Sequence, residues 1–258
     1  MKTFSLILNK INPYFTGLGL FALGEWFLHQ PANWIWQALV VFVFLFLMLV
    51  HLLRGKIFKL EFLFWLIILI SLVFAASLIL MTLETYWLSQ FVVFITALIA
   101  FIYLKNIYVF LYKSENYQTN ALEHITSYVN LMSLFFFFTA GFYFLIFLSW
   151  PLWIPLVGVG IALFILSLAR FWSHKVAFKK SLVYSVVFGL IFVELFWVVS
   201  YLPISNIVAG FVAAVIYFTL INLATQFIGS QLQKKYVIKQ ISITGGALLI
   251  VLLTAQWF

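Results

Sequence analysis

The chain contains no cysteine and no aspartate among its 258 residues, and only 8% of its residues are charged. The lack of cysteine excludes disulfides, thiolate metal sites, iron–sulfur clusters and a lipoprotein anchor. The lack of aspartate excludes the aspartate-rich magnesium motifs of membrane prenyltransferases. A soluble domain has about 25% charged residues, so the surface of a soluble protein cannot be built from this supply.

Hydrophobic residues make up 66% of the chain and aromatic residues 21%, with 32 phenylalanines. Nine apolar runs are long enough to cross a bilayer, which takes a helix of about 20 residues. Their approximate bounds are 13–28, 34–53, 60–83, 86–104, 120–148, 152–169, 181–201, 204–228 and 241–258. We therefore predict an all-α integral membrane protein of about nine transmembrane helices, forming a single polytopic transmembrane domain over residues 1–258.

The basic residues predict the orientation of these helices. If alternate connections lie on opposite sides, all 14 Lys and Arg fall on the side of the N-terminus, with the loops near 54–59, 105–120, 170–180 and 230–240. The opposite loops, near 29–33, 84–86, 150 and 202, carry no basic residue. Because cytoplasmic loops are enriched in Lys and Arg, we expect a cytoplasmic N-terminus, outward-pointing helical hairpins and an external C-terminus. A bacterial-type plasma membrane fits this pattern.

The net charge of +8 does not indicate a nucleic-acid-binding protein. Such a protein gathers its basic residues into one patch, whereas here they sit in short clusters between apolar runs. Anionic lipids at the cytoplasmic surface explain clusters of this kind. We expect the partners to be the lipid bilayer, its anionic lipids and either a protein partner or a second copy of the chain.

The position of Glu194 requires an explanation, because this glutamate lies in the second half of the apolar segment SLVYSVVFGLIFVELFWVVSY, residues 181–201. An ionisable side chain at bilayer depth costs about 2.5–3.5 kcal/mol on insertion scales. At 100° per residue, Leu190, Trp197 and the hydroxyl-bearing Tyr184 and Tyr201 share its side of the helix. This side is either a proton- or cation-binding site in a permeation path or an interhelical hydrogen-bonding contact through a carboxylic acid.

Two further polar groups are candidates. Near the predicted outer face, Glu25 and His29 lie one turn apart, and Glu84 stands in the second outer loop. These three residues would form a polar cluster if the first and third helices were neighbours; otherwise they are ordinary interfacial residues. In the eighth run, Asn222 and Gln226 lie one turn apart and predict either a hydrated inner vestibule facing the helix of Glu194 or plain interhelical hydrogen bonds.

Motifs for nucleotide binding, serine hydrolysis and zinc proteolysis are absent from the sequence. We therefore assign no catalytic, cofactor-binding or metal-binding residue. The preferred hypothesis is a small transporter or permease-like protein with Glu194 as its protonatable group. The first alternative is a non-catalytic subunit or scaffold of a membrane complex, whose partner uses the basic loops. The second is an enzyme acting on a lipid or lipid-linked substrate at the outer face, which needs Glu25, His29 and Glu84 to converge.

Overall fold

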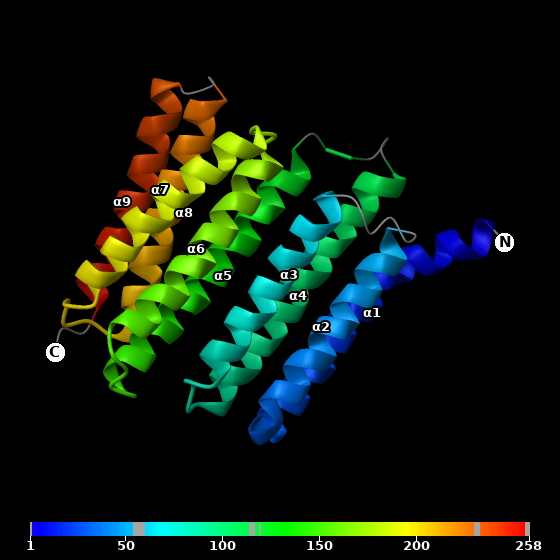
Figure 1. Ribbon diagram of the computed structural model, residues 1–258, viewed down its shortest axis with the longest axis horizontal. Helices are drawn as coiled ribbons and strands as arrows, with labels where there is room; N and C mark the ends of the chain where they lie inside the picture. Colours follow the sequence, from blue (N-terminus) through cyan, green and yellow to red (C-terminus); the bar gives the residue numbers. More distant parts are fainter. Residues whose placement is uncertain (1, 54–59, 114–116, 119, 230–232, 256–258) are drawn as a thin grey trace. The chain divides into compact units, whose positions relative to one another are not determined.

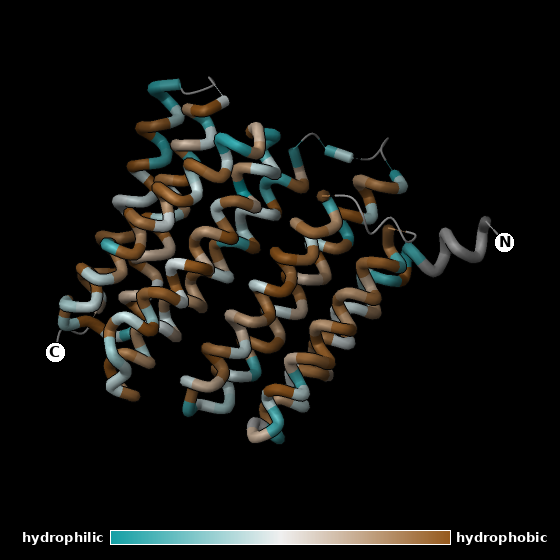
Figure 2. Tube along the Cα trace, viewed as in Figure 1, coloured by the Kyte–Doolittle hydropathy of each residue, from teal (hydrophilic) through white to brown (hydrophobic). Residues whose placement is uncertain are grey.

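The computed structural model of the protein describes residues 2–53, 60–113, 117–118, 120–229 and 233–255, with side chains from residue 9 onward except that of residue 31. Over these residues the chain is helical, with nine long helices and one short 3-10 turn (Figure 1). Figure 2 shows apolar residues along the helices and polar residues toward their ends. The prediction of an all-α protein is confirmed.

Eight of the nine helices described by the structure are long and apolar enough to cross a membrane. The exception is α1 (Lys2–His29), which includes two lysines and two asparagines in its first half. By helix length and hydropathy, the protein is a multi-pass integral membrane protein. The ninth span, the orientation of the helices and the identity of the membrane stay predictions.

Several helices extend beyond the apolar runs of the sequence. The helix α4 (Tyr86–Tyr112) continues eight residues past its predicted end, and α9 (Lys234–Thr254) begins seven residues before its predicted start. The most consequential extension is that of α6 (Trp153–Ser173), because it takes Arg170 out of the predicted loop and into the helix. The basic residues at 54–59, also expected in a loop, lie outside the described residues.

The chain divides within α5 (Ala121–Ile146) into two compact units, Met1–Val129 and Asn130–Phe258. The single transmembrane domain expected from the sequence stays a prediction.

In the first unit, α1 packs against α2 (Trp34–Leu52) and α4, while α3 (Leu60–Leu80) packs against α2 and α4. Glycines allow α1 to approach α4 closely. A Cβ atom on Gly24 would lie 2.6 Å from Cγ1 of Val93, and one on Gly17 would lie 3.1 Å from Cβ of Phe101. Figure 1 shows a bend in α1, which includes Pro13; proline cannot donate the backbone hydrogen bond that would continue the helix.

In the second unit, α6 packs along α7 (Phe178–Val199), and α8 (Asn206–Ile228) packs against α7 and α9. Aromatic rings fill the space between α7 and its neighbours. Phe196 stacks on Phe142 of α5 with ring centroids 4.2 Å apart, and Phe192 meets Tyr217 of α8 edge-on at 5.0 Å. All four rings are buried, so this side of α7 belongs to the protein core.

Candidate functional site

The helix α7 has two different sides, and Glu194 lies on the exposed one. The residues buried along α7 are Ser181, Ser185, Gly189, Phe192, Phe196 and Val199. Glu194 lies about 200° around the helix from both Phe192 and Phe196, and its side chain is exposed. The carboxyl group therefore points away from the core that the aromatic rings form.

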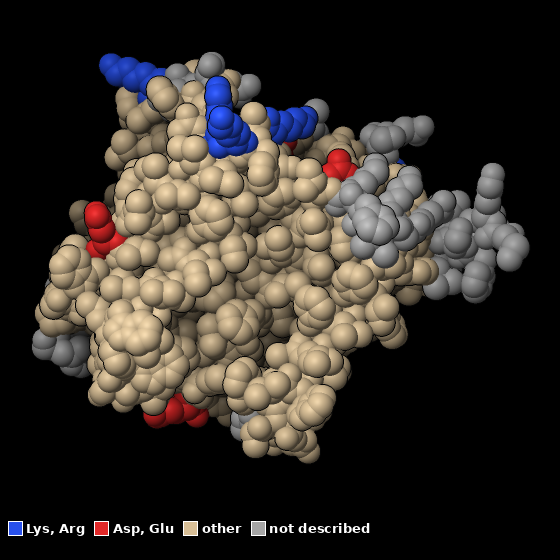
Figure 3. All heavy atoms as spheres, in the orientation of Figure 1, with Lys and Arg blue, Asp and Glu red and all other residues tan. Residues whose placement is uncertain are grey.

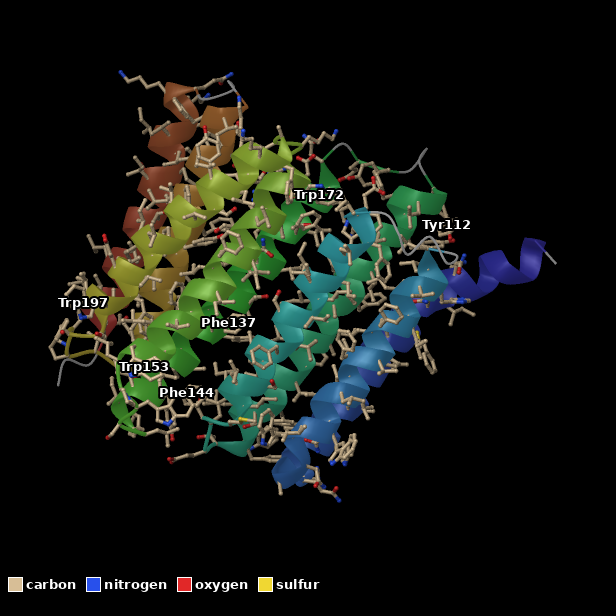
Figure 4. All side chains as sticks on the ribbon, in the orientation of Figure 1. Tyr112, Phe137, Phe144, Trp153, Trp172 and Trp197 are labelled. Carbon is tan, nitrogen blue, oxygen red and sulfur yellow. The ribbon has the colours of Figure 1, made fainter. Side chains whose placement is uncertain are left out.

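The side of α7 that carries Glu194 is otherwise apolar or aromatic. We call it the α7 face and define it by its exposed residues Tyr184, Val187, Leu190, Glu194, Trp197, Val198 and Tyr201. Every residue that the helical spacing placed beside Glu194 is thus exposed together with it. Trp197 donates a hydrogen bond of 3.0 Å from Nε1 to the hydroxyl of Tyr201, and Figure 4 labels Trp197 on this exposed side.

Within the described residues, Glu194 forms neither a hydrogen bond nor an ion pair. It lies about 24 Å along α7 from Phe178 and about 8 Å from Val199, at a rise of 1.5 Å per residue. This position is inside the hydrocarbon layer if α7 spans the membrane, because that layer is about 30 Å thick. Among the described residues, the carboxyl group of Glu194 is therefore exposed and has no hydrogen-bonding or ionic partner.

Asn222 and Thr219 of α8 form side-chain hydrogen bonds with helices other than α7. Asn222 is buried and its Oδ1 atom accepts a hydrogen bond of 2.9 Å from Nη2 of Arg170 in α6. Thr219 lies on the same helix and shares a hydroxyl hydrogen bond of 2.5 Å with Thr244 of α9. Gln226, the other residue of the predicted vestibule, is half-buried.

Arg170 is a buried charge that the sequence interpretation missed. Only 5% of its surface is exposed, and its neighbour Ser167 shares a hydrogen bond of 2.9 Å with the hydroxyl of Tyr217. Together with Asn222, these residues form a buried polar cluster between α6 and α8. Ser167 and Arg170 lie three residues apart, as expected on one face of a helix, and this spacing is the signal that could have placed Arg170 inside α6.

The outer-face candidates do not come together as a group of three. Glu25 of α1 accepts a hydrogen bond of 2.9 Å from Nε2 of Gln90 in α4, and the same Nε2 atom lies 3.0 Å from the hydroxyl of Tyr86. His29 turns its Nδ1 atom to the backbone oxygen of Glu25 at 2.9 Å. Glu84 is exposed in the turn between α3 and α4, and no hydrogen bond or ion pair among the described residues joins it to Glu25 or His29.

The ionisable residues of these sites do not converge into one cluster within the described part of the chain. Among the described residues, no group of three His, Cys, Asp or Glu side chains is arranged to hold a metal ion. Glu25 is engaged by an amide, and Glu194 stands alone among apolar side chains. Glu194 is thus an exposed ionisable group on an otherwise apolar or aromatic side of α7.

Comparisons with known protein families, with curated proteins and with solved structures find no match to this chain.

Proposed function

We propose that the protein is a non-catalytic subunit or scaffold of a membrane complex and that it binds its partner through the α7 face. The observation that carries this proposal is the exposed carboxyl group of Glu194 inside an apolar helix face. Lipid tails offer no hydrogen bond, and polar residues within transmembrane helices normally face protein or water. A contact with another membrane-embedded polypeptide would satisfy Glu194 at this depth.

The sequence suggests that a partner binds the basic loops, whereas the exposed side of α7 favours a partner that binds the α7 face. We further propose that the basic loops lie against anionic lipids on the cytoplasmic side of a bacterial-type plasma membrane. Figure 3 supports this arrangement, because the Lys and Arg side chains on the visible face gather toward one end of the helices. Each basic residue near an anionic surface contributes about 1 kcal/mol to such binding.

Cysteine cross-linking in intact membranes tests the proposal, since the chain has no cysteine of its own. We expect Ile191→Cys and Val198→Cys, both exposed on α7, to give the same discrete adduct with a membrane-permeant cross-linker. Phe94→Cys, exposed on α4, is the control and should not give this adduct. The proposal fails if neither α7 variant forms an adduct, or if all three variants form the same one.

A small transporter is the second candidate, and the buried cluster of Arg170, Asn222 and Tyr217 favours it. Buried ionisable residues within membrane-spanning helices often mark substrate or ion pathways. In proteoliposomes, Glu194→Gln should abolish a pH-dependent flux if Glu194 is the protonatable group. Flux that Glu194→Gln leaves unchanged would contradict that role.

A further inference from the structure

We propose that the partner covering the α7 face contributes a transmembrane helix with a lysine or arginine at the depth of Glu194, and that this helix belongs to a different polypeptide. The inference rests on the proposed function, because it names the chemistry of the partner that the α7 face would bind. It follows from two observations: the surroundings of Glu194 and the depth of the basic residues in the chain itself.

The first observation is that the α7 face offers Glu194 little hydrogen bonding. Leu190 and Val198, which lie four residues before and after Glu194 on the α7 face, are aliphatic and cannot form a hydrogen bond with it. The indole of Trp197 donates to Tyr201 rather than to the carboxyl group. Hydrogen bonds between ionised groups are about twice as strong as neutral ones, and charged residues in membranes pair with one another. A lysine or arginine is therefore the complementary partner for this carboxylate.

The second observation is that the described helices of a second copy carry no lysine or arginine as far from their basic ends as Glu194 is. The basic residues that lie deepest in the described helices are Lys10 in α1 and Lys105 in α4, about 12 Å and 10 Å from the helix ends that carry the basic loops. Arg170 lies about 5 Å from the end of α6 and already binds Asn222. Glu194 lies about 24 Å from the corresponding end of α7.

An inverted second copy would bring its basic residues to the other side of the membrane. The clustering of all 14 Lys and Arg on one side predicts a single orientation for every copy, so inversion is disfavoured. Charge complementarity within the membrane therefore points to another polypeptide and not to self-association.

Designed peptides test this inference with the full-length protein in phosphatidylcholine vesicles. We would use three leucine-rich transmembrane peptides of about 20 residues that differ only at the depth of Glu194, where they carry lysine, glutamine or leucine. Energy transfer would be measured from the labelled peptide to a dye on Leu202→Cys, in the exposed turn after α7. We expect the lysine peptide to bind about 3- to 20-fold more tightly than the leucine peptide, the range of single polar contacts in membranes.

Charge reversal is the decisive comparison. Glu194→Leu should abolish the preference for lysine, and Glu194→Lys should transfer the preference to a peptide that carries glutamate at the same depth. Glu84→Leu removes an exposed glutamate of a loop and should leave the preference unchanged.

Three results would overturn the inference: equal binding of the lysine and leucine peptides, glutamine binding as tightly as lysine, or α7 cross-links that join two copies of this chain. The α7 variants could still form an adduct with another protein in native membranes when the peptides show no preference for lysine. That result would support the proposed function and would contradict only the inference that the partner carries a lysine or arginine.

Discussion

Nη2 of Arg170 in α6 donates a hydrogen bond of 2.9 Å to Oδ1 of Asn222 in α8, across 52 residues of sequence. The bond joins two helices that are not consecutive, since α7 lies between them in the chain. A hydrogen bond to a charged group contributes about 1.5–3 kcal/mol, and both side chains are buried. The pair therefore links α6 to α8 within the second unit.

Replacing Asn222 by leucine should destabilise the protein, because it removes the acceptor that Arg170 uses while keeping the branching and the number of heavy atoms of the side chain. We expect the unfolding free energy in mixed micelles to fall by about 1.5–3 kcal/mol. Gln226→Leu, one turn later on α8 and half-buried, is the control and should change it by no more than about 0.5 kcal/mol. A double-mutant cycle with Arg170→Met should give a coupling of about 0.5–3 kcal/mol; purely additive effects would contradict the prediction.

Gly24→Ala should loosen the contact between α1 and α4, because the added methyl group would lie 2.6 Å from Cγ1 of Val93. Overpacking of this kind costs about 1–3 kcal/mol. Gly246→Ala is the matched change, since a Cβ atom there has no neighbour within 4 Å. Alanine is the better helix former by about 1 kcal/mol, so this second variant should be neutral or slightly more stable. Thermal unfolding of both variants checks the difference, and equal shifts would be inconsistent with it.

Truncation of the adjacent residues Phe196 and Trp197 should change the stability of the protein by very different amounts. Phe196 is fully buried and stacks on Phe142, so Phe196→Ala should cost about 3–5 kcal/mol of unfolding free energy. Trp197 is 47% exposed, and Trp197→Ala should change stability by no more than about 0.5 kcal/mol. Trp197→Ala should instead weaken cross-linking from Val198→Cys, if the α7 face is the interface. A larger loss of stability from Trp197→Ala than from Phe196→Ala would reverse the assignment of the two sides.

Single cysteines should report the predicted orientation directly. Glu84 stands in an exposed turn between α3 and α4, and Lys175 is exposed between α6 and α7. A membrane-impermeant maleimide added to intact cells should label Glu84→Cys and should label Lys175→Cys only after permeabilisation. Labelling of Lys175→Cys in intact cells, with Glu84→Cys protected, would show that the orientation is inverted.

The composition of α7 and its neighbours explains which features of the fold can be predicted from the sequence. The apolar runs and the lack of charge predict the helices, since a helix in lipid must be long and apolar. The helical period placed Tyr184, Leu190, Trp197 and Tyr201 on the side of Glu194, as the structure has them. The period alone cannot say whether that side faces protein or membrane, because both environments are apolar.

The pairings of polar residues could not be predicted because they depend on which helices are neighbours. Glu25 meets Gln90, 65 residues away, because α1 packs along α4. The sequence predicts Arg170 in a loop, because the apolar run ends at Ala169 and basic residues follow it up to Lys180. Its hydrogen-bond acceptor, Asn222, is in the sequence only one polar residue among several on α8.

The helix α9 has no buried residue, although it packs against α8 and shares the hydroxyl bond between Thr219 and Thr244. The apolar stretch of α9 is therefore exposed, whereas half of the residues in the apolar stretches of α6 and α8 are buried within the protein. At 21 residues α9 is about 31 Å long, close to the thickness of a typical hydrocarbon layer. In a bilayer of different thickness, tilting of α9 relieves the hydrophobic mismatch at small cost, and the buried contact between Arg170 and Asn222 keeps its geometry.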